Sequence, residues 1–321
     1  MSAIRTIWRR YGKIAAVLGV LAAAGAAAVS GCDSYPVVLL RENMLSDTPY
    51  MLAKNHPKPK DWPADRITAT WVGHATVLVN FYGTTILTDP VLGERLEPPR
   101  LGRANIGIRR ITELPVKFEL LPPIDAVLLS HAHQDHWDTA SLEMFGDKTL
   151  AIVPAGDADL VPPNIATIVE LDWGGVTLVK DVTVRAFRVR HWGERIGAPN
   201  HPRGYNGYVL TGHGRTVVFV GDTAGAPWDW GQMSGVSSAD MVILPIGEYV
   251  YAANHQTPEQ AWDFFNQVGG KKMLATHWRT FILSPRDKLP TFEPMERLTK
   301  AAGGRADAIV CKEPGDVVEV P

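Results

Sequence analysis

Four side chains able to bind a metal ion occur within six residues of this chain. The segment reads His131-Ala132-His133-Gln134-Asp135-His136, and it follows an apolar run at residues 126–129 that is typical of a buried strand. A short loop at a strand end can turn successive side chains toward one point, and imidazole and carboxylate groups suit zinc without any thiolate. If these four polar side chains had only a structural role, crowding them at the end of a hydrophobic strand would be energetically unfavourable. The segment therefore predicts a metal site.

Three further residues of the same chemical types follow strand-like runs later in the chain: His191, Asp222 and His277. Each would be unremarkable alone. The two cysteines, Cys32 and Cys311, have no paired or metal-ligand spacing. Any metal is therefore expected to be held by nitrogen and oxygen atoms, and Cys311 is expected to be a buried strand cysteine.

The HxHxDH pattern at residues 131–136 resembles the signature of the metallo-β-lactamase superfamily, and the later candidates follow in the family's order. The resemblance implies two Zn²⁺ ions, or another divalent metal in their place. It implies that one ion is bound by His131, His133 and His191, that the second is bound by Asp135, His136 and His277, and that Asp222 bridges them. Asp135 and Asp222 are the expected catalytic carboxylates. Such a pair of metals serves hydrolysis of acyl and phosphoryl groups alike, so it does not select a substrate.

Several neighbouring residues are candidates for supporting roles. The resemblance makes Asp89, in Thr88-Asp89-Pro90, a residue that orients a ligand imidazole, with an ordinary turn aspartate as the alternative. His74 could line the site. The candidate substrate-binding residues are Trp137, Trp192, Trp278 and His255. Core packing beneath the ligand loops is the alternative for the three tryptophans.

The resemblance extends over roughly residues 67–291 and is closest to the branch that contains N-acylphosphatidylethanolamine-hydrolysing phospholipase D. The matching stretches include residues 71–79, 86–91, 191–195, 255–261 and 277–284. The chain departs from this branch at Gln134, where tyrosine is usual, at Arg279, where glycine is usual, and in part over residues 93–98. These departures bear on the substrate and leave the metal ligands intact.

Alternating and apolar runs predict a body rich in strands. The expected strands are 67–71, 75–81, 84–87, 126–129, 150–153, 176–179, 182–189, 205–210, 216–220, 241–244, 272–275 and 317–320. Helices are expected at 139–145 and 258–267, the second with Thr257 as its N-cap and Pro258 in its first turn. The fold class is therefore α/β, a metallo-β-lactamase αββα sandwich of two packed mixed sheets flanked by helices. Residues 94–123 are expected to form a long surface excursion, which is often functional.

The N-terminus has the layout of a secretory signal. Four basic residues and no acidic one precede or flank an apolar run at 14–29, and residues 29–32 resemble a bacterial lipobox with Cys32 as the lipidated residue. An uncleaved anchor helix is the alternative. We expect a signal sequence at 1–31, a proline-rich linker or stalk at 32–66 and a hydrolase domain at 67–321. The protein is then expected in the bacterial cell envelope, anchored to a membrane through its N-terminus and facing the periplasm or the exterior.

The composition limits the partners. The chain of 321 residues is 45% hydrophobic and 21% charged, enough apolar material for a large core. Its formal net charge of −2 becomes −6 for the residues after 31, which argues against a nucleic-acid partner. A lipid or a small molecule is the expected substrate. The sequence does not indicate an oligomeric state.

Three function classes compete. The first is a zinc-dependent phosphodiesterase acting on N-acylphosphatidylethanolamine-like phospholipids, of the phospholipase D type. The second is a metal-dependent lactonase or other hydrolase of a small soluble substrate. The third is a non-enzymatic envelope lipoprotein, disfavoured because all seven ligand positions are intact. Phosphodiester and lactone substrates separate the first two, and absence of bound metal would favour the third.

Overall fold

The computed structural model describes residues 49–96, 107–195, 197–199, 201–228, 236, 238–247, 254–283 and 292–321. The expected signal sequence and Cys32 lie outside these residues. Within the described ranges, no helix has the length and apolar content needed to cross a membrane.

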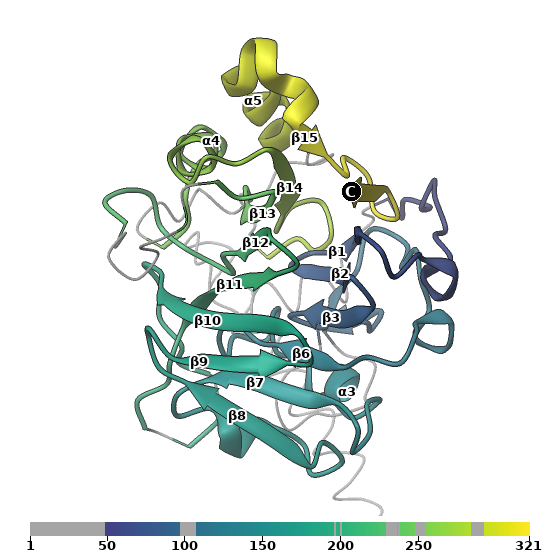
Figure 1. Ribbon diagram of the computed structural model, residues 1–321, viewed down its shortest axis with the longest axis vertical. Coiled ribbons are helices and arrows are strands. Elements are labelled where there is room, and N and C mark those ends of the chain that lie inside the picture. Colours follow the sequence, from purple (N-terminus) through teal and green to yellow (C-terminus); the bar gives the residue numbers. More distant parts are fainter. Residues whose placement is uncertain are drawn as a thin grey trace, which may run out of the picture.

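Two seven-stranded sheets make up most of the structure (Figure 1). The first has the order β16-β1-β2-β3-β6-β7-β8, with β16 at Val317–Val320, β1 at Ile67–Gly73, β2 at Thr76–Phe81, β3 at Thr84–Thr88, β6 at Ala126–Leu128, β7 at Leu150–Pro154 and β8 at Thr167–Leu171. The second has the order β15-β14-β13-β12-β11-β10-β9, with β15 at Ile309–Val310, β14 at Lys272–Thr276, β13 at Met241–Pro245, β12 at Arg215–Phe219, β11 at Asn206–Gly212, β10 at Val182–Arg188 and β9 at Val176–Val179.

The main hydrophobic core lies between the two sheets. It joins Trp71 and Phe81 of the first sheet to Phe187 and Phe219 of the second in one cluster of buried side chains. A second cluster, which includes Leu142, covers the opposite face of the first sheet. Every residue of β1 and β2 is buried as a result.

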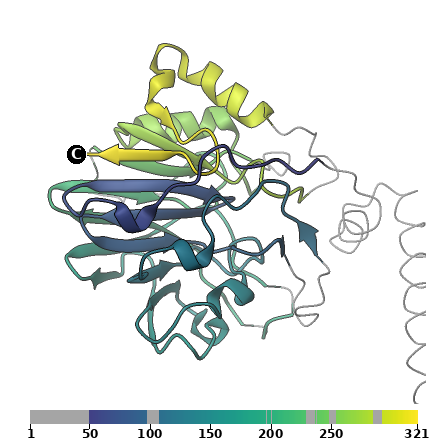
Figure 2. The ribbon, with the colours of Figure 1, turned by 90° about the vertical axis from the view of Figure 1, so that its right-hand side faces the viewer.

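Among the described residues, the helices are few and lie outside the sheets. They are α3 at Thr139–Leu142, α4 at Pro258–Gln267 and α5 at Glu293–Ala302, with 3₁₀ turns at Pro59–Asp61, Phe118–Leu120, Ala158–Leu160 and Gly303–Ala308. α4 and α5 lie together on the side of the second sheet, whereas α3 lies near β6 and β7 (Figures 1 and 2). The expected α/β sandwich is confirmed.

Every expected strand overlaps an observed one, but several other elements differ from the prediction. β8 and α5 were not expected. β8 is an edge strand with mostly exposed side chains, and α5 has no side-chain N-cap, so both lack the usual sequence signals. The helix expected over 139–145 ends at Leu142, because the amide of Phe145 bonds the carbonyl of Leu142 in a tighter turn.

Residues 50–66, expected to belong to a linker, pack against the domain. The amide of Met51 donates to the carbonyl of Ile111 at 2.8 Å, and its carbonyl accepts from the amide of Glu113 at 2.8 Å. Asn55 donates to Asp316 at 2.6 Å, close to the C-terminus. These contacts satisfy backbone groups that a free stalk would expose to water, so the linker prediction is wrong for this part.

Strand directions place six strand ends at corresponding edges of the two sheets. β3 and β6 are parallel, and β1 runs the same way because β1 and β3 are each antiparallel to β2. β12 and β14 both run parallel to β13, and β10 shares their direction because β10 and β12 are each antiparallel to β11. The loops after these six strands therefore leave their sheets on one side, where ligand sites form in α/β proteins.

Candidate metal centre

The loops at this edge carry all seven expected ligands. The segment at 131–136 follows β6, and His191, Asp222 and His277 follow β10, β12 and β14. The loops of the two sheets are joined directly, since the amide of His277 donates to the carbonyl of His74, after β1, at 3.0 Å. The structure thus brings residues nearly 150 positions apart in sequence into one cluster.

His131, His133 and His191 form the first group. His131 Nε2 lies 2.8 Å from His133 Nδ1, and His191 Nε2 lies 3.3 Å from the same atom. A metal with four ligands at zinc-type bond lengths separates its ligand atoms by about 3.3 Å. The three nitrogens therefore have nearly the spacing that one ion requires, and they are among the sets of atoms close enough to share an ion.

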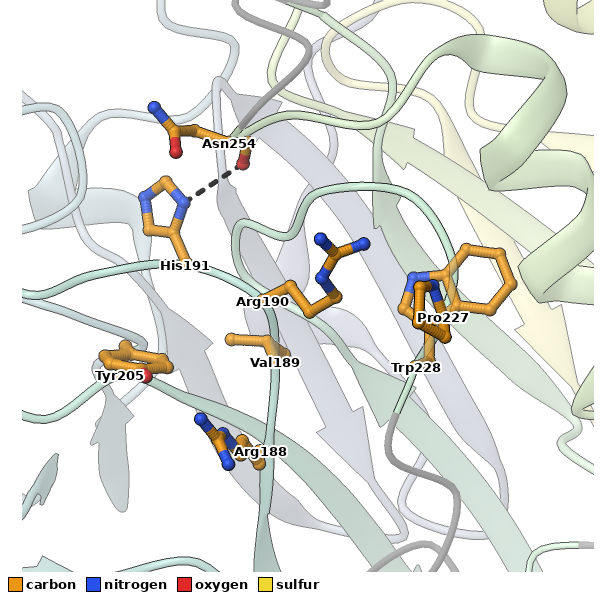
Figure 3. Close-up of a pocket in the computed structure, with 8 residues that line it drawn as sticks. All are labelled: Arg188, Val189, Arg190, His191, Tyr205, Pro227, Trp228 and Asn254. Atoms are coloured by element: carbon orange, nitrogen blue, oxygen red, sulfur yellow. Dashed lines mark hydrogen bonds between the residues drawn. The ribbon is translucent and has the colours of Figure 1, made fainter.

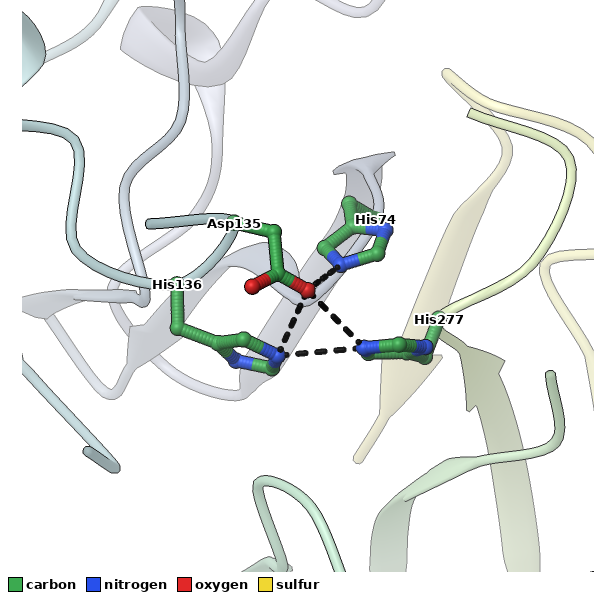
Figure 4. A group of neighbouring side chains, drawn as sticks. All are labelled: His74, Asp135, His136 and His277. Carbon is green, nitrogen blue, oxygen red and sulfur yellow. Dashed lines mark hydrogen bonds and ion pairs between the residues drawn. The ribbon is translucent and has the colours of Figure 1, made fainter. Parts of the chain in front are cut away.

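Asp135, His136 and His277 form the second group (Figure 4). Asp135 Oδ2 lies 3.4 Å from His136 Nε2 and 3.3 Å from His277 Nε2, and the two imidazole nitrogens are 3.1 Å apart. His74 joins this group, with its Nε2 2.9 Å from the same carboxylate oxygen. The expected division of the ligands into two sets corresponds to the arrangement of the side chains.

Asp222 lies between the two groups. Its Oδ2 is 3.1 Å from His136 Nε2, 3.2 Å from His277 Nε2 and 3.8 Å from His191 Nε2. Its other oxygen, Oδ1, is buried and has no hydrogen-bond partner within the described part of the chain. A buried carboxylate oxygen without a partner is unfavourable unless a cation completes it, so this atom fits a metal site.

The outer nitrogens of three imidazoles are held by hydrogen bonds. His136 Nδ1 donates to Asp89 Oδ2 at 2.6 Å, and His191 Nδ1 donates to the carbonyl of Asn254 at 3.1 Å. Ser130 Oγ donates to Asp89 at 2.6 Å and lies 2.9 Å from His131 Nδ1, so that nitrogen is the donor to Ser130. Each bond places a proton on the outer nitrogen and leaves the lone pair of Nε2 directed into the cluster, as metal binding requires.

Burial keeps most of these histidines neutral. It lowers the pKa of His131 and His191 well below 6.5, that of His133 and His255 to about 4 and that of His74 to about 3. Neutral imidazole is the form that binds metal. These side chains are thus ready ligands at neutral pH.

The charges at the centre of the cluster are coupled. Burial opposes ionisation of Asp135 and Asp222, but the surrounding histidines, above all His136, hold both pKa values well below 3.8. Burial also opposes the charge of His136, and the carboxylates of Asp222 and Asp135 raise its pKa well above 6.5. Two carboxylates held ionised beside these imidazoles form an environment that suits cations.

The backbone around the cluster adopts conformations that side chains usually avoid. His74, Asp89 and His277 have φ values of 51°, 32° and 62°. Such left-handed residues cost on the order of 1–3 kcal/mol each and are concentrated at functional sites. Gly247 allows β13 and β14 to approach here, because a Cβ at this position would overlap the carbonyl oxygen of His277.

A cavity of about 380 Å³ opens onto the cluster. Its polar side is formed by His133, Asp135, Asp222, His255 and Gln134, and its apolar side by Leu96, Ile108, Leu283 and Trp192. Leu96 and Ile108 belong to the two-stranded ribbon of β4 at Arg95–Leu96 and β5 at Ile108–Arg109, within the expected surface excursion. Polar and apolar walls meet at the candidate metal centre.

The candidate substrate-binding residues divide into two pairs. Trp192 and His255 line this cavity, and His255 Nδ1 lies 3.8 Å from Asp222 Oδ2. Trp137 is completely buried in the cluster behind the first sheet, and Trp278 is buried and stacks on Trp71 at 5.4 Å. Trp137 and Trp278 are core residues, in agreement with the alternative of core packing beneath the ligand loops.

Two departures from the family branch have different consequences in the structure. Gln134 lines the cavity, which is where a side chain could contact a substrate. Arg279 is not among the lining residues. Its guanidinium pairs with Glu313 at 2.5 Å and lies 4.1 Å from the ring centre of Phe292, so this departure concerns packing near the C-terminus.

Comparison with known proteins agrees with this geometry. The sequence model of a family described as Beta-lactamase superfamily domain matches residues 84–278. An uncharacterized protein of Mycobacterium tuberculosis is 31% identical over 274 residues, which cover 80% of this chain and 69% of that protein. The chain belongs to the metallo-β-lactamase superfamily.

Two further relatives extend the comparison. The N-acyl-phosphatidylethanolamine-hydrolyzing phospholipase D 1 of Caenorhabditis elegans is 29% identical over 246 residues, covering 69% of this chain and 68% of that protein. The structure of Igni18, a metallo hydrolase from Ignicoccus hospitalis, matches with a TM-score of 0.55 at 18% identity and covers 79% of this chain and 98% of that one. This metallo-β-lactamase-fold chain is a metal-dependent hydrolase with a histidine and aspartate cluster that could hold metal ions.

Proposed function

We propose that this chain is a dinuclear zinc phosphodiesterase that hydrolyses N-acylphosphatidylethanolamine-like phospholipids, with phospholipase D specificity. The observation that carries the proposal is the cavity of mixed character, in which an apolar wall lies directly beside the polar cluster. A phospholipid presents acyl chains and a phosphodiester in the same arrangement. A small soluble substrate would not require the apolar wall.

The chain's own residues would divide the work. Leu96, Ile108 and Leu283 would contact the acyl chains, while the cluster around Asp222 would receive the phosphate. Metal ions bound there would polarise the phosphoryl group and lower the pKa of a water molecule. Asp89 and Ser130 would keep the ligand imidazoles oriented through the hydrogen bonds described above. Cleavage on the headgroup side would release phosphatidic acid and an N-acylethanolamine.

The named relative supports the same substrate class. The C. elegans enzyme hydrolyses N-acylphosphatidylethanolamine by its printed name, and its similarity covers more than two thirds of each chain. At 29% identity this similarity supports the substrate class and leaves the headgroup and acyl chains open.

The direct test is to incubate metal-replete protein with mixed micelles of N-acylphosphatidylethanolamine and to identify the products by mass spectrometry. We expect phosphatidic acid and N-acylethanolamine, with loss of activity in Asp222→Ala. Because apolar contacts should contribute to transition-state binding, short-chain analogues should lose both rate and affinity. Release of fatty acid or diacylglycerol, or activity confined to soluble lactones, would exclude the phospholipase D assignment.

We also propose that the protein is anchored in the bacterial envelope through a lipidated Cys32 and faces the periplasm or the exterior. The support is the sequence of residues 1–32, with its basic start, apolar run and terminal cysteine. Cys32→Ala should release the protein from the membrane fraction or leave its precursor unprocessed. Mass spectrometry of the mature N-terminus decides the matter, because an intact Met1 would favour the anchor helix.

A further inference from the structure

Arg110, the residue that follows β5, is completely buried although its side chain is charged. Burial lowers its pKa to about 10 against the opposing effect of Glu94, so the guanidinium stays protonated at neutral pH. A charge in the interior costs stability unless polar groups receive it. The ligand and substrate-binding roles described above do not use this side chain, and its contacts indicate what the buried charge holds in place.

The guanidinium of Arg110 joins two loops at the edge that carries the metal centre. Its Nη2 donates to the carbonyl of Val91 at 2.5 Å and its Nε to the carbonyl of Gly93 at 3.2 Å, both in the loop after β3. Its carbon atom lies 5.1 Å from the ring centre of Phe281, in the loop after β14. A planar guanidinium can donate to several carbonyls while it contacts an aromatic face. The side chain therefore connects a loop of the first sheet to a loop of the second.

The main chain around Arg110 strengthens this junction. The amide of Arg110 donates to the carbonyl of Glu94 at 2.9 Å, and the amide of Ile111 donates to the carbonyl of Thr280 at 2.9 Å. Gly73, the last residue of β1, leaves room for the guanidinium, because a Cβ there would lie 2.4 Å from Nη1. The loops after β1, β3 and β14 thus meet at one buried side chain.

The guanidinium also adjoins a small apolar cluster behind the wall of the cavity at the metal centre. The apolar cluster consists of Val91, Leu96, Ile108 and Phe281, with Leu283 packed against it. Its members Leu96, Ile108 and Leu283 line that cavity. The other two members are the ones that Arg110 contacts through its hydrogen bond and its ring contact. The neighbouring cavity of about 450 Å³ beside His191 and Asn254 is lined by other residues (Figure 3). Arg110 therefore fixes the inner side of the apolar cluster, whose outer side faces the metal centre.

We propose that Arg110 is a positioning residue that sets the apolar wall of the cavity and thereby the preference of the enzyme for long acyl chains. The inference rests on the proposed phosphodiesterase function and deepens it. Without the guanidinium, the buried carbonyls of Val91 and Gly93 would lose this donor, and the segment that leads to Leu96 would move to satisfy them. The wall would then lose the shape that receives an acyl chain.

Binding of phosphatidic acid, the expected product that carries the acyl chains, tests this inference without requiring turnover. Isothermal titration calorimetry of metal-replete protein compares the dihexanoyl and dioctanoyl lipids below their critical micelle concentrations. The wild type should bind the dioctanoyl lipid about tenfold more tightly, as expected if roughly half of its four additional methylene groups are buried. Arg110→Met should reduce this ratio to about twofold by weakening binding of the longer lipid, because most of that contact would be lost. The affinity for the dihexanoyl lipid and the metal content should not change, since the hydrogen bonds of Asp89 do not involve Arg110.

Arg110→Lys and Arg203→Met are the matched variants. The lysine can donate to one of the two carbonyls but lacks the planar fork, so its ratio should lie between those of the wild type and Arg110→Met. Arg203 is also a buried arginine, and it holds Gly156 and Asp157 through hydrogen bonds at 3.2 and 3.1 Å. It lines neither cavity, so Arg203→Met should keep the wild-type ratio.

An unchanged ratio in Arg110→Met, or the same fall in Arg203→Met, would overturn the inference. If Arg110→Met does not fold, Arg110→Lys decides, because the wild-type ratio in that variant would equally overturn it. Equal affinity of the wild type for the two lipids would count against it in the same way. Failure to cleave N-acylphosphatidylethanolamine, with the expected binding ratios intact, would refute the phosphodiesterase proposal and leave the role of Arg110 in place.

Discussion

At the scale of single residues, Asp89 shows how the site depends on partners outside the ligand set. It is completely buried and accepts hydrogen bonds from the amide and hydroxyl of Ser130 and from His136 Nδ1, at 2.6–2.7 Å. One carboxylate thereby orients His136 directly and His131 through Ser130. From the sequence, an ordinary turn aspartate was an equally good interpretation of Asp89. The pairing of β3 with β6 places Asp89 beside Ser130 and His136, which favours the orienting role.

Replacing this carboxylate should weaken metal binding. In Asp89→Asn the amide cannot accept all three hydrogen bonds at full strength, so we expect a loss of about 10–100-fold in metal affinity or activity. Competition with a calibrated chelator measures the affinity. Asp240→Asn is the control, since Asp240 is also buried but bonds Thr216 and Lys271 away from the cluster. Equal losses in both variants would show a general loss of stability instead.

The motif at 131–136 could be recognised from sequence and His74 was expected near the site, but the contact of His74 with Asp135 and the orientation of Trp137 could not be predicted. His74 lies 2.9 Å from Asp135, although 61 residues separate them, because the β1–β2 turn reaches the cluster. Trp137 follows a ligand directly, yet it points into the core behind the first sheet. Adjacency in sequence does not determine on which side of a loop a side chain lies. Assigning a side chain to the site or to the core therefore requires the three-dimensional structure.

At the scale of elements, the start of α4 supports the cavity. Thr257 Oγ1 accepts from the amide of Gln260 at 3.2 Å, and Gln260 Oε1 accepts from the amide of Thr257 at 2.9 Å, which is a complete capping box. His255 precedes this cap by two residues and lines the cavity. The helix was predictable from sequence because its cap, its Pro258 and its periodicity agree.

Loss of this cap should have a measurable cost. Thr257→Ala removes one side-chain acceptor and should lower the free energy of unfolding by about 1 kcal/mol, measured by denaturant titration. Thr299→Ala is the matched control in α5, where the hydroxyl bonds only the carbonyl of Met295 and provides no cap. Its effect should stay within about 0.5 kcal/mol. Similar losses in the two variants would contradict a specific role for the cap.

Two loops are joined by a buried carboxylate that should make stability depend on pH. Asp157, after β7, accepts from Arg203 at 3.1 Å, and burial raises its pKa from 3.8 to about 7 despite this partner. Because the folded state holds the proton more tightly, stability is full below pH 3.8 and is lost as the pH rises toward 7. The loss contributed by Asp157 should be at most about 4 kcal/mol.

The variant Asp157→Asn cannot ionise, so its stability should fall less between pH 4 and pH 7 than that of the wild type, by denaturant titration at each pH. Asp159→Asn is the control, because Asp159 pairs with the same Arg203 but has its pKa lowered by that contact. Its stability should decline with pH as in the wild type. A slope unchanged in Asp157→Asn would refute the assignment.

At the scale of the whole molecule, the site exists because two sheets present their strand ends together. The sequence predicted the strands and the sandwich, since apolar runs and turn residues mark each one. It did not predict that residues 50–56 contact Glu113 and Asp316, because local sequence patterns do not indicate hydrogen bonds between distant parts of the chain. The sequence likewise predicted only a long surface segment at residues 94–123, and it did not predict that β4 and β5 form an apolar wall of the cavity.

The central claim is that the assembled cluster is a dinuclear metal centre. Its most direct test is the metal content of protein purified without chelators, measured by inductively coupled plasma mass spectrometry. We expect close to two ions per chain, mostly zinc, a reduced content in Asp222→Ala, and an unchanged content in Cys311→Ser, whose buried thiol lies outside the cluster. A protein that carries no metal, or one that loses it on replacement of Cys311, would contradict the account.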